Sequence, residues 1–297
     1  MFGGLSAFPL TPFKDERVDV AAFRVLVDRL VTAGVDSLGV LGSTGSYAYL
    51  EKAERKAVLR EAIDRAGSVP VIAGVGALRT ADVLELALDA EQAGAAGLLL
   101  APVSYQPLHD DEVFSMYETV CSAVNTPICV YDNPGTTHFT FSDALHGRIA
   151  ALPNIASIKI PGVPGVQAEA DARVASLRAK VPPHVTIGIS GDSAAARGLN
   201  AGCEVWYSVI GGLFPEVALR ITRLSIAGRA QDAQECSDRL QPLWTLFEKH
   251  GGSIRVVATA AALLGLCSDA NLPRPLRTLT GEDRAELAEV LAATVLA

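Results

Sequence analysis

The chain has 297 residues, of which 49% are hydrophobic and 6% aromatic, and its formal net charge at pH 7 is −8. This length suits one large α/β domain or two small ones, and the lack of any basic run argues against nucleic acid as a partner. No apolar run reaches the roughly 20 residues of a membrane-spanning helix, and the N-terminus lacks a signal-peptide pattern, so we expect no membrane partner.

Short apolar runs alternate with amphipathic helical patterns from one end of the chain nearly to the other. In the first unit, an apolar run is followed by a helix that Asp19 is suited to cap and Gly34 is suited to end. Seven similar units follow. The expected strands lie at 5–10, 35–41, 70–75, 96–101, 127–131, 155–160, 185–189 and 204–209. The expected helices lie at 19–33, 51–66, 80–93, 110–124, 142–150, 167–180, 193–201 and 215–227.

Eight strand–helix units predict an α/β fold of the closed (β/α)8 TIM-barrel type. The alternative, a doubly wound open sheet, requires a glycine-rich phosphate turn after the first strand, and residues 8–12 do not provide one. Further helical patterns follow at 231–250, 253–264 and 281–296. We interpret these as additional C-terminal helices that pack on the barrel, which gives a catalytic barrel over 1–228 and a helical extension over 229–297.

The five cysteines are scattered along the chain and never form a Cys-x-x-Cys motif. An odd number of scattered cysteines is typical of reduced thiols, so we expect a cytoplasmic protein without a disulfide framework. The five histidines form no His-x-His or His-Glu-x-x-His pattern, and the sequence therefore predicts no metal site.

Residues 154–162 contain a single lysine within an apolar run. Ile155, Ile158 and Ile160 predict a buried strand, and burying an ammonium group is costly. A lysine in apolar surroundings tends to lose its proton, and a neutral amine is a nucleophile for carbonyl carbons. The central hypothesis is that Lys159 forms a Schiff base with a 2-keto acid. The alternative is a strand-end lysine whose ammonium group extends to solvent.

Polar residues follow several other expected strands, at the barrel end where active sites are found. The turn at 42–45 (Gly-Ser-Thr-Gly) offers hydroxyls and backbone N–H groups that can bind a carboxylate, or that merely cap the next helix. Tyr131 can exchange protons with a substrate oxygen, or can be a rim tyrosine bonded to water. Asp192 is suited either to orienting a substrate hydroxyl or to capping a helix.

Taken together and in this order, these motifs resemble the dihydrodipicolinate synthase/N-acetylneuraminate lyase family of class I pyruvate-dependent aldolases. The motifs are Gly-Ser-Thr-Gly after the second strand, Tyr-x-x-Pro at 131–134, the strand lysine, and Ser-Gly-Asp at 190–192. The resemblance covers essentially the whole chain, including the opening residues 8–12 and Leu-Gly-Leu at 264–266.

The resemblance implies roles for individual residues. Lys159 would be the Schiff-base residue, and Tyr131 the general acid/base. Ser43 and Thr44 would bind the keto-acid carboxylate, with Thr44 also relaying protons to Tyr131. The resemblance also implies a homotetramer that is a dimer of dimers. No metal or organic cofactor is expected, because a covalent imine on Lys159 would serve as the electron sink.

Departures from the family pattern bear on the second substrate. Synthases of the family carry an arginine two residues after the proline of the tyrosine motif, to hold the carboxylate of aspartate semialdehyde, and here that position is Thr136. A hydroxyl cannot replace a guanidinium fork in that role. Sialic-acid lyases carry a small polar residue two positions after the lysine, where this chain has Pro161.

Three further departures concern the surroundings of the expected site. Ser46 replaces the glutamate that usually follows the Gly-Ser-Thr-Gly turn, and Asp132 replaces an asparagine after the tyrosine. The tyrosine that synthases extend across a dimer aligns with Ser104, and Tyr105 lies one position further on. We include Tyr105 among the expected substrate-binding residues, with Tyr207 on the eighth strand.

We therefore expect a Schiff-base-forming lyase that joins pyruvate or a 2-keto acid to an unidentified aldehyde, or that catalyses the reverse cleavage. Thr136, Thr137 and Asp192 suggest a hydroxylated or sugar-derived aldehyde. One alternative is a 2-keto-3-deoxy sugar acid dehydratase or hydratase-aldolase, which would use the same imine. A second is 4-hydroxy-tetrahydrodipicolinate synthase, which Thr136 disfavours. A third is a non-catalytic keto-acid binding protein, which would need neither Lys159 nor Tyr131.

Overall fold

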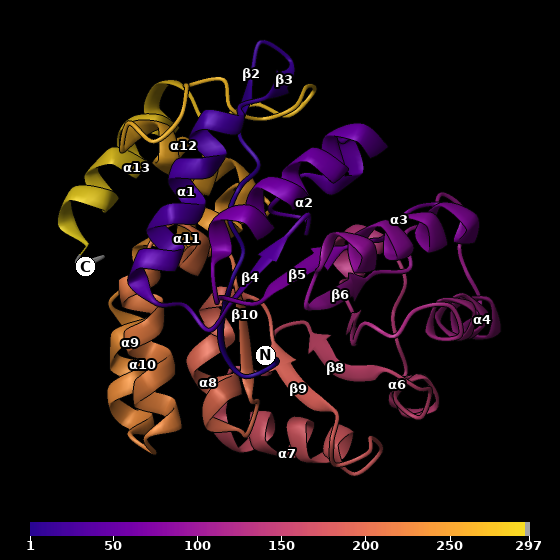
Figure 1. The fold of residues 1–297 in the computed structure, drawn as a ribbon. Helices are drawn as coiled ribbons and strands as arrows, with labels where there is room; N and C mark the ends of the chain where they lie inside the picture. The colour runs from indigo at the N-terminus through magenta and orange to yellow at the C-terminus, as the bar shows by residue number, and fades with distance from the viewer. Residues whose placement is uncertain (295–297) are drawn as a thin grey trace.

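The computed structural model describes residues 1–294 (Figure 1), and its centre is a closed barrel of eight parallel strands. The strands follow one another around the barrel in the order β1-β10-β9-β8-β7-β6-β5-β4. Their bounds are Gly4–Ala7 (β1), Ser37–Val40 (β4), Val71–Gly74 (β5), Gly97–Leu100 (β6), Ile128–Tyr131 (β7), Ile155–Ile160 (β8), Thr186–Ile189 (β9) and Val205–Ser208 (β10). The expected (β/α)8 barrel is confirmed.

A helix follows each barrel strand and packs on the outside of the sheet (Figure 1). The eight helices are Val20–Ala33 (α1), Lys52–Ala66 (α2), Thr80–Ala93 (α3), Asp110–Cys121 (α4), Asp143–Ala150 (α6), Gln167–Arg178 (α7), Ala195–Asn200 (α8) and Pro215–Ile226 (α9). Helix α1 begins and ends as the sequence predicts. The Asp19 side chain accepts a hydrogen bond from the N–H group of Ala22, and Gly34 ends the helix at φ 75°.

Several short elements were not apparent from the sequence pattern, because each spans only two to four residues and so shows no repeat of a period. They are the two-stranded hairpin of Phe13–Lys14 (β2) and Arg17–Val18 (β3), helix Pro134–Thr137 (α5), and the 3-10 helices Tyr47–Tyr49 (η1), Asp192–Ala194 (η2) and Ile210–Gly212 (η3). Helix α5 and the three 3-10 helices lie just beyond barrel strands, so they shape the loops that carry the expected site.

The single helix expected over 231–250 is wrong. The structure has two helices there, Ala230–Asp238 (α10) and Gln241–Lys249 (α11), and α10 packs against α8 and α9. Pro242 lies in the first turn of α11, where its missing N–H group costs nothing but prevents a helix from continuing through from α10.

Two more helices complete the described chain. They are Ser253–Leu263 (α12) and Gly281–Ala293 (α13), which pack against each other and against α11 (Figure 1). The end of the helix expected at 281–296 lies outside the described residues. Within residues 1–294, every helix is too short or too polar to cross a bilayer.

Two glycines on the barrel strands make room for aromatic rings inside the barrel. A Cβ atom on Gly39 would lie 2.2 Å from the ring of Phe8, and one on Gly188 would lie 2.3 Å from the ring of Tyr207. The two rings meet edge to face, with centroids 6.1 Å apart. The rings of Phe8 and Tyr207 therefore occupy the part of the barrel interior where Lys159 of β8 lies.

Candidate active site

Lys159 lies inside the barrel, on β8, and only 4% of its surface is exposed. It is paired in register with Tyr131 on β7 and with Gly188 on β9. Its Nζ atom lies 4.1 Å from the ring centroids of Phe8 and Tyr131 and 5.6 Å from that of Tyr207. This burial does not fit a strand-end lysine whose ammonium group reaches bulk solvent.

Aromatic rings form most of the surroundings of this amine. No side chain in residues 1–294 makes a hydrogen bond or ion pair with the Lys159 ammonium group. Ring faces attract cations while they exclude water. The environment therefore suits both a reactive amine and the protonated imine that such an amine forms with a carbonyl compound.

The hydroxyl of Tyr131 is at the centre of a small polar cluster above the lysine. It lies 3.3 Å from Ser43 Oγ and accepts a 2.8 Å hydrogen bond from the side-chain amide of Asn133. The same amide lies 3.5 Å from Ser43 Oγ. Asn133 was missed at the sequence level, although it is the third residue of the Tyr-x-x-Pro motif and carries a donor.

The turn at 42–45 presents Ser43, not Thr44, to Tyr131. Thr44 is buried and makes no hydrogen bond to Tyr131 in the described chain. The expected relay through Thr44 stays a prediction, and in this structure the hydroxyl next to the tyrosine is that of Ser43. The residues on either side of the turn, Leu41 and Ser46, have φ of 58° and 54°, so the direction of each hydroxyl is set by a backbone conformation that periodicity does not reveal.

Asp192 lies buried at the end of β9, and its carboxylate is already bonded to the neighbouring loop. It accepts hydrogen bonds from Trp206 Nε1 at 3.0 Å, from the N–H group of Ile210 at 2.7 Å, and from the Ser208 hydroxyl and the N–H group of Val209 at 3.2 Å each. Burial raises the pKa of Asp192, and these donors oppose the rise. The carboxylate caps the start of η3, and little of its hydrogen-bond accepting capacity remains for the expected substrate hydroxyl.

Replacing Asp192 with asparagine is expected to lower the free energy of unfolding by about 2 kcal/mol, because an amide nitrogen would face backbone donors that now bond to a carboxylate. Urea denaturation measures this loss. Covalent capture of a keto acid at Lys159 should persist in the same variant. Loss of capture at unchanged stability would instead assign Asp192 to the substrate.

Tyr207 also differs from its expected role. It is fully buried, and its hydroxyl lies 2.6 Å from Ser157 Oγ and accepts a 3.3 Å contact from Cys129 Sγ. Since its polar end bonds to the side chains of β7 and β8, Tyr207 supports the lysine through its ring rather than offering its hydroxyl to substrate.

The last two expected substrate-binding residues are exposed. Tyr105 is 89% exposed on the loop before α4. Thr136 lies on α5, with Oγ1 3.5 Å from the carbonyl oxygen of Asn133. Thr136 is thus next to the polar cluster, whereas no described contact joins Tyr105 to it.

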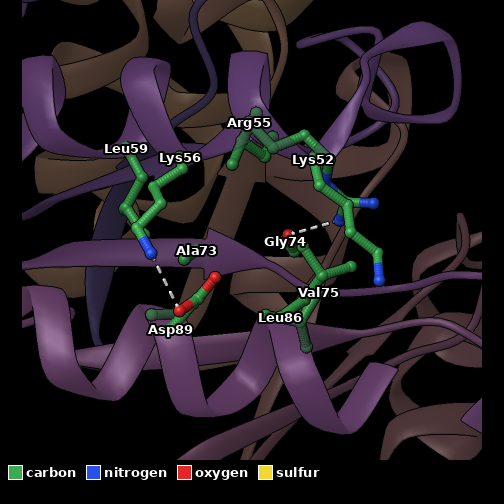
Figure 2. A pocket seen from close by; sticks show the side chains of 11 residues that line it. Lys52, Arg55, Lys56, Leu59, Ala73, Gly74, Val75, Leu86 and Asp89 are labelled. Atoms are coloured by element: carbon green, nitrogen blue, oxygen red, sulfur yellow. Dashed lines mark hydrogen bonds and ion pairs between the residues drawn. The ribbon is translucent and has the colours of Figure 1, made fainter. Parts of the chain in front are cut away.

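A small cavity between α2, β5 and α3 is a separate feature (Figure 2). Its volume is about 20 Å³, enough for one water molecule but not for a keto acid. The Arg55 guanidinium beside it donates to the carbonyl oxygens of Gly74 and Gly76 at 2.9 and 3.0 Å, and Lys56 pairs with Asp89 at 3.1 Å. Burial lowers the pKa of Arg55 to about 10. These contacts indicate a structural role at the end of β5.

Comparisons with known proteins match this architecture. Residues 1–294 match the sequence model described as the dihydrodipicolinate synthetase family. A 4-hydroxy-tetrahydrodipicolinate synthase from Persephonella marina is 30% identical over 296 residues, which cover 98% of each chain. The crystal structure of dihydrodipicolinate synthase from Agrobacterium tumefaciens is 45% identical, with a TM-score of 0.94 and 98% of each chain covered. A chloride-inhibited dihydrodipicolinate synthase from Acinetobacter baumannii, complexed with pyruvate, is 26% identical, with a TM-score of 0.88 and 99% of each chain covered.

Proposed function

This chain belongs to the dihydrodipicolinate synthetase family and is a Schiff-base-forming carbon–carbon lyase, and from that premise we propose that Lys159 is the residue that forms the imine with pyruvate or a related 2-keto acid. The observation that carries this proposal is the buried Lys159 amine, which lies 4.1 Å from the ring centroids of Phe8 and of Tyr131, a residue that carries a hydroxyl. Such a pairing of a desolvated amine with a proton donor is what imine chemistry requires.

The proposed reaction begins when Lys159 Nζ attacks the keto carbon, and water leaves to give a protonated imine. The imine withdraws electrons from the neighbouring methyl group, which loses a proton to solvent to form an enamine. The enamine carbon then attacks the aldehyde carbon, and Tyr131 supplies a proton to the aldehyde oxygen. The Ser43 hydroxyl lies 3.3 Å from that of Tyr131 and is placed to relay a proton from solvent back to the tyrosine. Hydrolysis of the imine releases the product and regenerates Lys159.

The keto-acid carboxylate is proposed to bind at the turn of residues 42–45. The N–H groups of Ser43, Thr44 and Gly45 donate to no acceptor within residues 1–294, and the two hydroxyls add further donors. Consecutive free N–H groups in a tight turn form a concave site for an anion. We assign no cofactor to the reaction, because the imine cation itself is the electron sink.

For the second substrate, a neutral hydroxylated aldehyde is proposed. Asn133 offers a neutral amide beside Tyr131, and the Thr136 hydroxyl bonds to the backbone of Asn133; neither can pair with a carboxylate as a guanidinium does. Condensation with aspartate semialdehyde, the activity that the names of the relatives suggest, is the second candidate. It is favoured by similarity along the whole chain and disfavoured by Thr136.

Enzyme assays with both kinds of aldehyde test this choice. Relative to the preferred neutral hydroxyaldehyde, kcat/KM for aspartate semialdehyde should be lower by about 100-fold, since the charge-assisted clamp is missing. A Thr136→Arg variant should recover part of that loss. Equal kcat/KM values for the two aldehydes in the unmodified enzyme would contradict the proposal and favour the synthase.

A dehydratase or hydratase-aldolase would use the same Lys159 imine but break a C–O bond. Product analysis separates the two chemistries: an aldolase acting on a 2-keto-3-deoxy sugar acid releases pyruvate, whereas a dehydratase returns a longer keto acid. A binding protein without activity would form neither product.

We also propose that the protein is a cytoplasmic homotetramer, a dimer of dimers. Large apolar side chains at Leu78, Tyr105 and Tyr49, on the segments that follow β5, β6 and β4, are 65%, 89% and 46% exposed, and their burial between subunits would support the assembly. The five cysteines are free, which supports a reducing compartment. Light scattering on the purified protein measures the assembly directly.

Borohydride reduction in the presence of pyruvate tests the central proposal. We expect a reduced pyruvyl group on the peptide that contains Lys159, found by mass spectrometry. An adduct on another lysine, or no adduct with pyruvate or longer 2-keto acids in a folded protein, would refute the role of Lys159.

A further inference from the structure

A buried carboxyl–imidazole pair lies directly behind the proposed acid/base residue. Asp132 follows Tyr131 at the end of β7 and is 5% exposed, and His146 on α6 is fully buried. Asp132 Oδ2 and His146 Nε2 are 3.5 Å apart. Within residues 1–294, Asp132 Oδ1 and both imidazole nitrogens have no hydrogen-bond partner. Burying such polar groups costs free energy of folding unless they form a hydrogen bond with each other.

The surroundings of the pair keep it nearly neutral. The Phe141 ring stacks on His146 with centroids 4.8 Å apart. The charged groups that face the pair are Asp143 on α6 and Arg173 on α7, which pair with each other at 2.9 Å and so largely cancel. A further ionisable group near the pair is Tyr117 on α4, whose hydroxyl donates to the carbonyl oxygen of Leu100.

Burial acts on both members of the pair in the direction of neutrality. It raises the pKa of Asp132 to about 7, and it lowers the pKa of His146 to about 4. Below about pH 7 the pair therefore holds a protonated carboxyl group that can donate to a neutral imidazole. Above about pH 7 the carboxyl group is ionised while the imidazole stays neutral.

The backbone and one side chain link this pair to the proposed site. The Asp132 N–H group donates to the carbonyl oxygen of Lys159 at 3.0 Å. On one side of Asp132 is Tyr131, and on the other is Asn133, whose amide donates to the Tyr131 hydroxyl. A change in the charge or position of Asp132 therefore acts on the segment that holds both the tyrosine and its hydrogen-bond donor.

We propose that Asp132 and His146 form a positioning pair for Tyr131. The pair shares one proton and so holds residues 131–133 in place, and ionisation of Asp132 slows proton donation by Tyr131. This proposal rests on the proposed roles of Lys159 and Tyr131. Its physical basis is that Tyr131 gains negative charge when it gives up its proton, and a carboxylate on the adjacent residue opposes that charge.

The pH dependence of kcat for the condensation of pyruvate with the preferred neutral hydroxyaldehyde tests this. That reaction includes the step in which Tyr131 donates its proton to the aldehyde oxygen. In the unmodified enzyme kcat should fall roughly fivefold as the pH rises through 7, because Asp132 ionises. In Asp132→Asn that fall should disappear, and in His146→Gln its midpoint should shift.

A matched control is Asp111→Asn, which removes a carboxylate that is exposed on α4 and, within residues 1–294, pairs only with Arg148. Its pH profile of kcat should match that of the unmodified enzyme. A profile of Asp132→Asn that parallels the unmodified enzyme, with the borohydride adduct on Lys159 intact, would overturn the positioning pair alone. Absence of the adduct in the unmodified enzyme would overturn the proposed function, and the positioning pair with it.

An independent measurement on the unmodified protein guards against variants that fold poorly. In protein labelled with ¹⁵N-histidine, the His146 resonances, assigned by their loss in His146→Gln, should show a neutral ring down to about pH 5. They should also shift as the pH crosses about 7, when Asp132 ionises. Titration of His146 as an ordinary histidine would overturn the proposal.

Discussion

Replacing Lys159 with methionine is expected to reduce the lyase turnover by at least about 10⁴-fold, because the variant has no amine to form the imine. The fold should be retained. Methionine is unbranched and similar in length. It replaces a lysine that is 4% exposed and whose ammonium group has no hydrogen-bond or ion-pair partner in the described chain. The free energy of unfolding should therefore stay the same or rise by about 1–3 kcal/mol. Turnover, borohydride capture of pyruvate and urea denaturation measure the three effects.

The same substitution at an exposed lysine provides the control. Lys180, which follows α7, is exposed on the surface, and Lys180→Met should retain turnover, capture and stability. Turnover that survives in Lys159→Met would contradict the imine mechanism at this residue. Unchanged pyruvate affinity in Lys159→Met, together with no turnover in the unmodified protein, would instead favour a keto-acid binding protein.

The barrel was predictable because it is encoded locally. Eight apolar runs alternating with helical patterns are enough to predict it, and the caps at Asp19 and Gly34 locate the ends of α1. Lys159 was also predictable, because a lysine in a buried strand conflicts with its surroundings. The break between α10 and α11 was missed because the helical pattern continues across Pro242.

The details of the site depend on contacts between distant segments, and those are not visible in a single sequence. Polar residues at strand ends face either the substrate or a neighbouring loop. Asp192 faces the neighbouring loop because the backbone N–H groups after β10 donate to its carboxylate. The Tyr207 hydroxyl is directed to Ser157 on β8. The aromatic surroundings of the amine likewise depend on Phe8 and on the space that Gly39 leaves for its ring.

Replacing Tyr131 with phenylalanine is expected to reduce turnover by about 100- to 1000-fold, the usual contribution of a positioned acid or base. The ring would remain, so the surface over the lysine amine, now 4.1 Å from the ring centroid, would be kept. Only the hydroxyl that contacts Ser43 and Asn133 would be lost. Borohydride capture of pyruvate at Lys159 should therefore persist, with a loss concentrated in kcat rather than in KM.

The neighbouring buried tyrosine, Tyr47 on η1, is the matched control. Its ring packs under the guanidinium of Arg55, and burial raises its pKa well above the ordinary value. Tyr47→Phe should leave turnover within about twofold of the unmodified enzyme, since its hydroxyl has no part in the proposed proton transfers. Equal losses in Tyr131→Phe and Tyr47→Phe would indicate a packing effect. Loss of the Lys159 adduct in Tyr131→Phe alone would assign the tyrosine to imine formation rather than to the later transfer of a proton to the aldehyde oxygen.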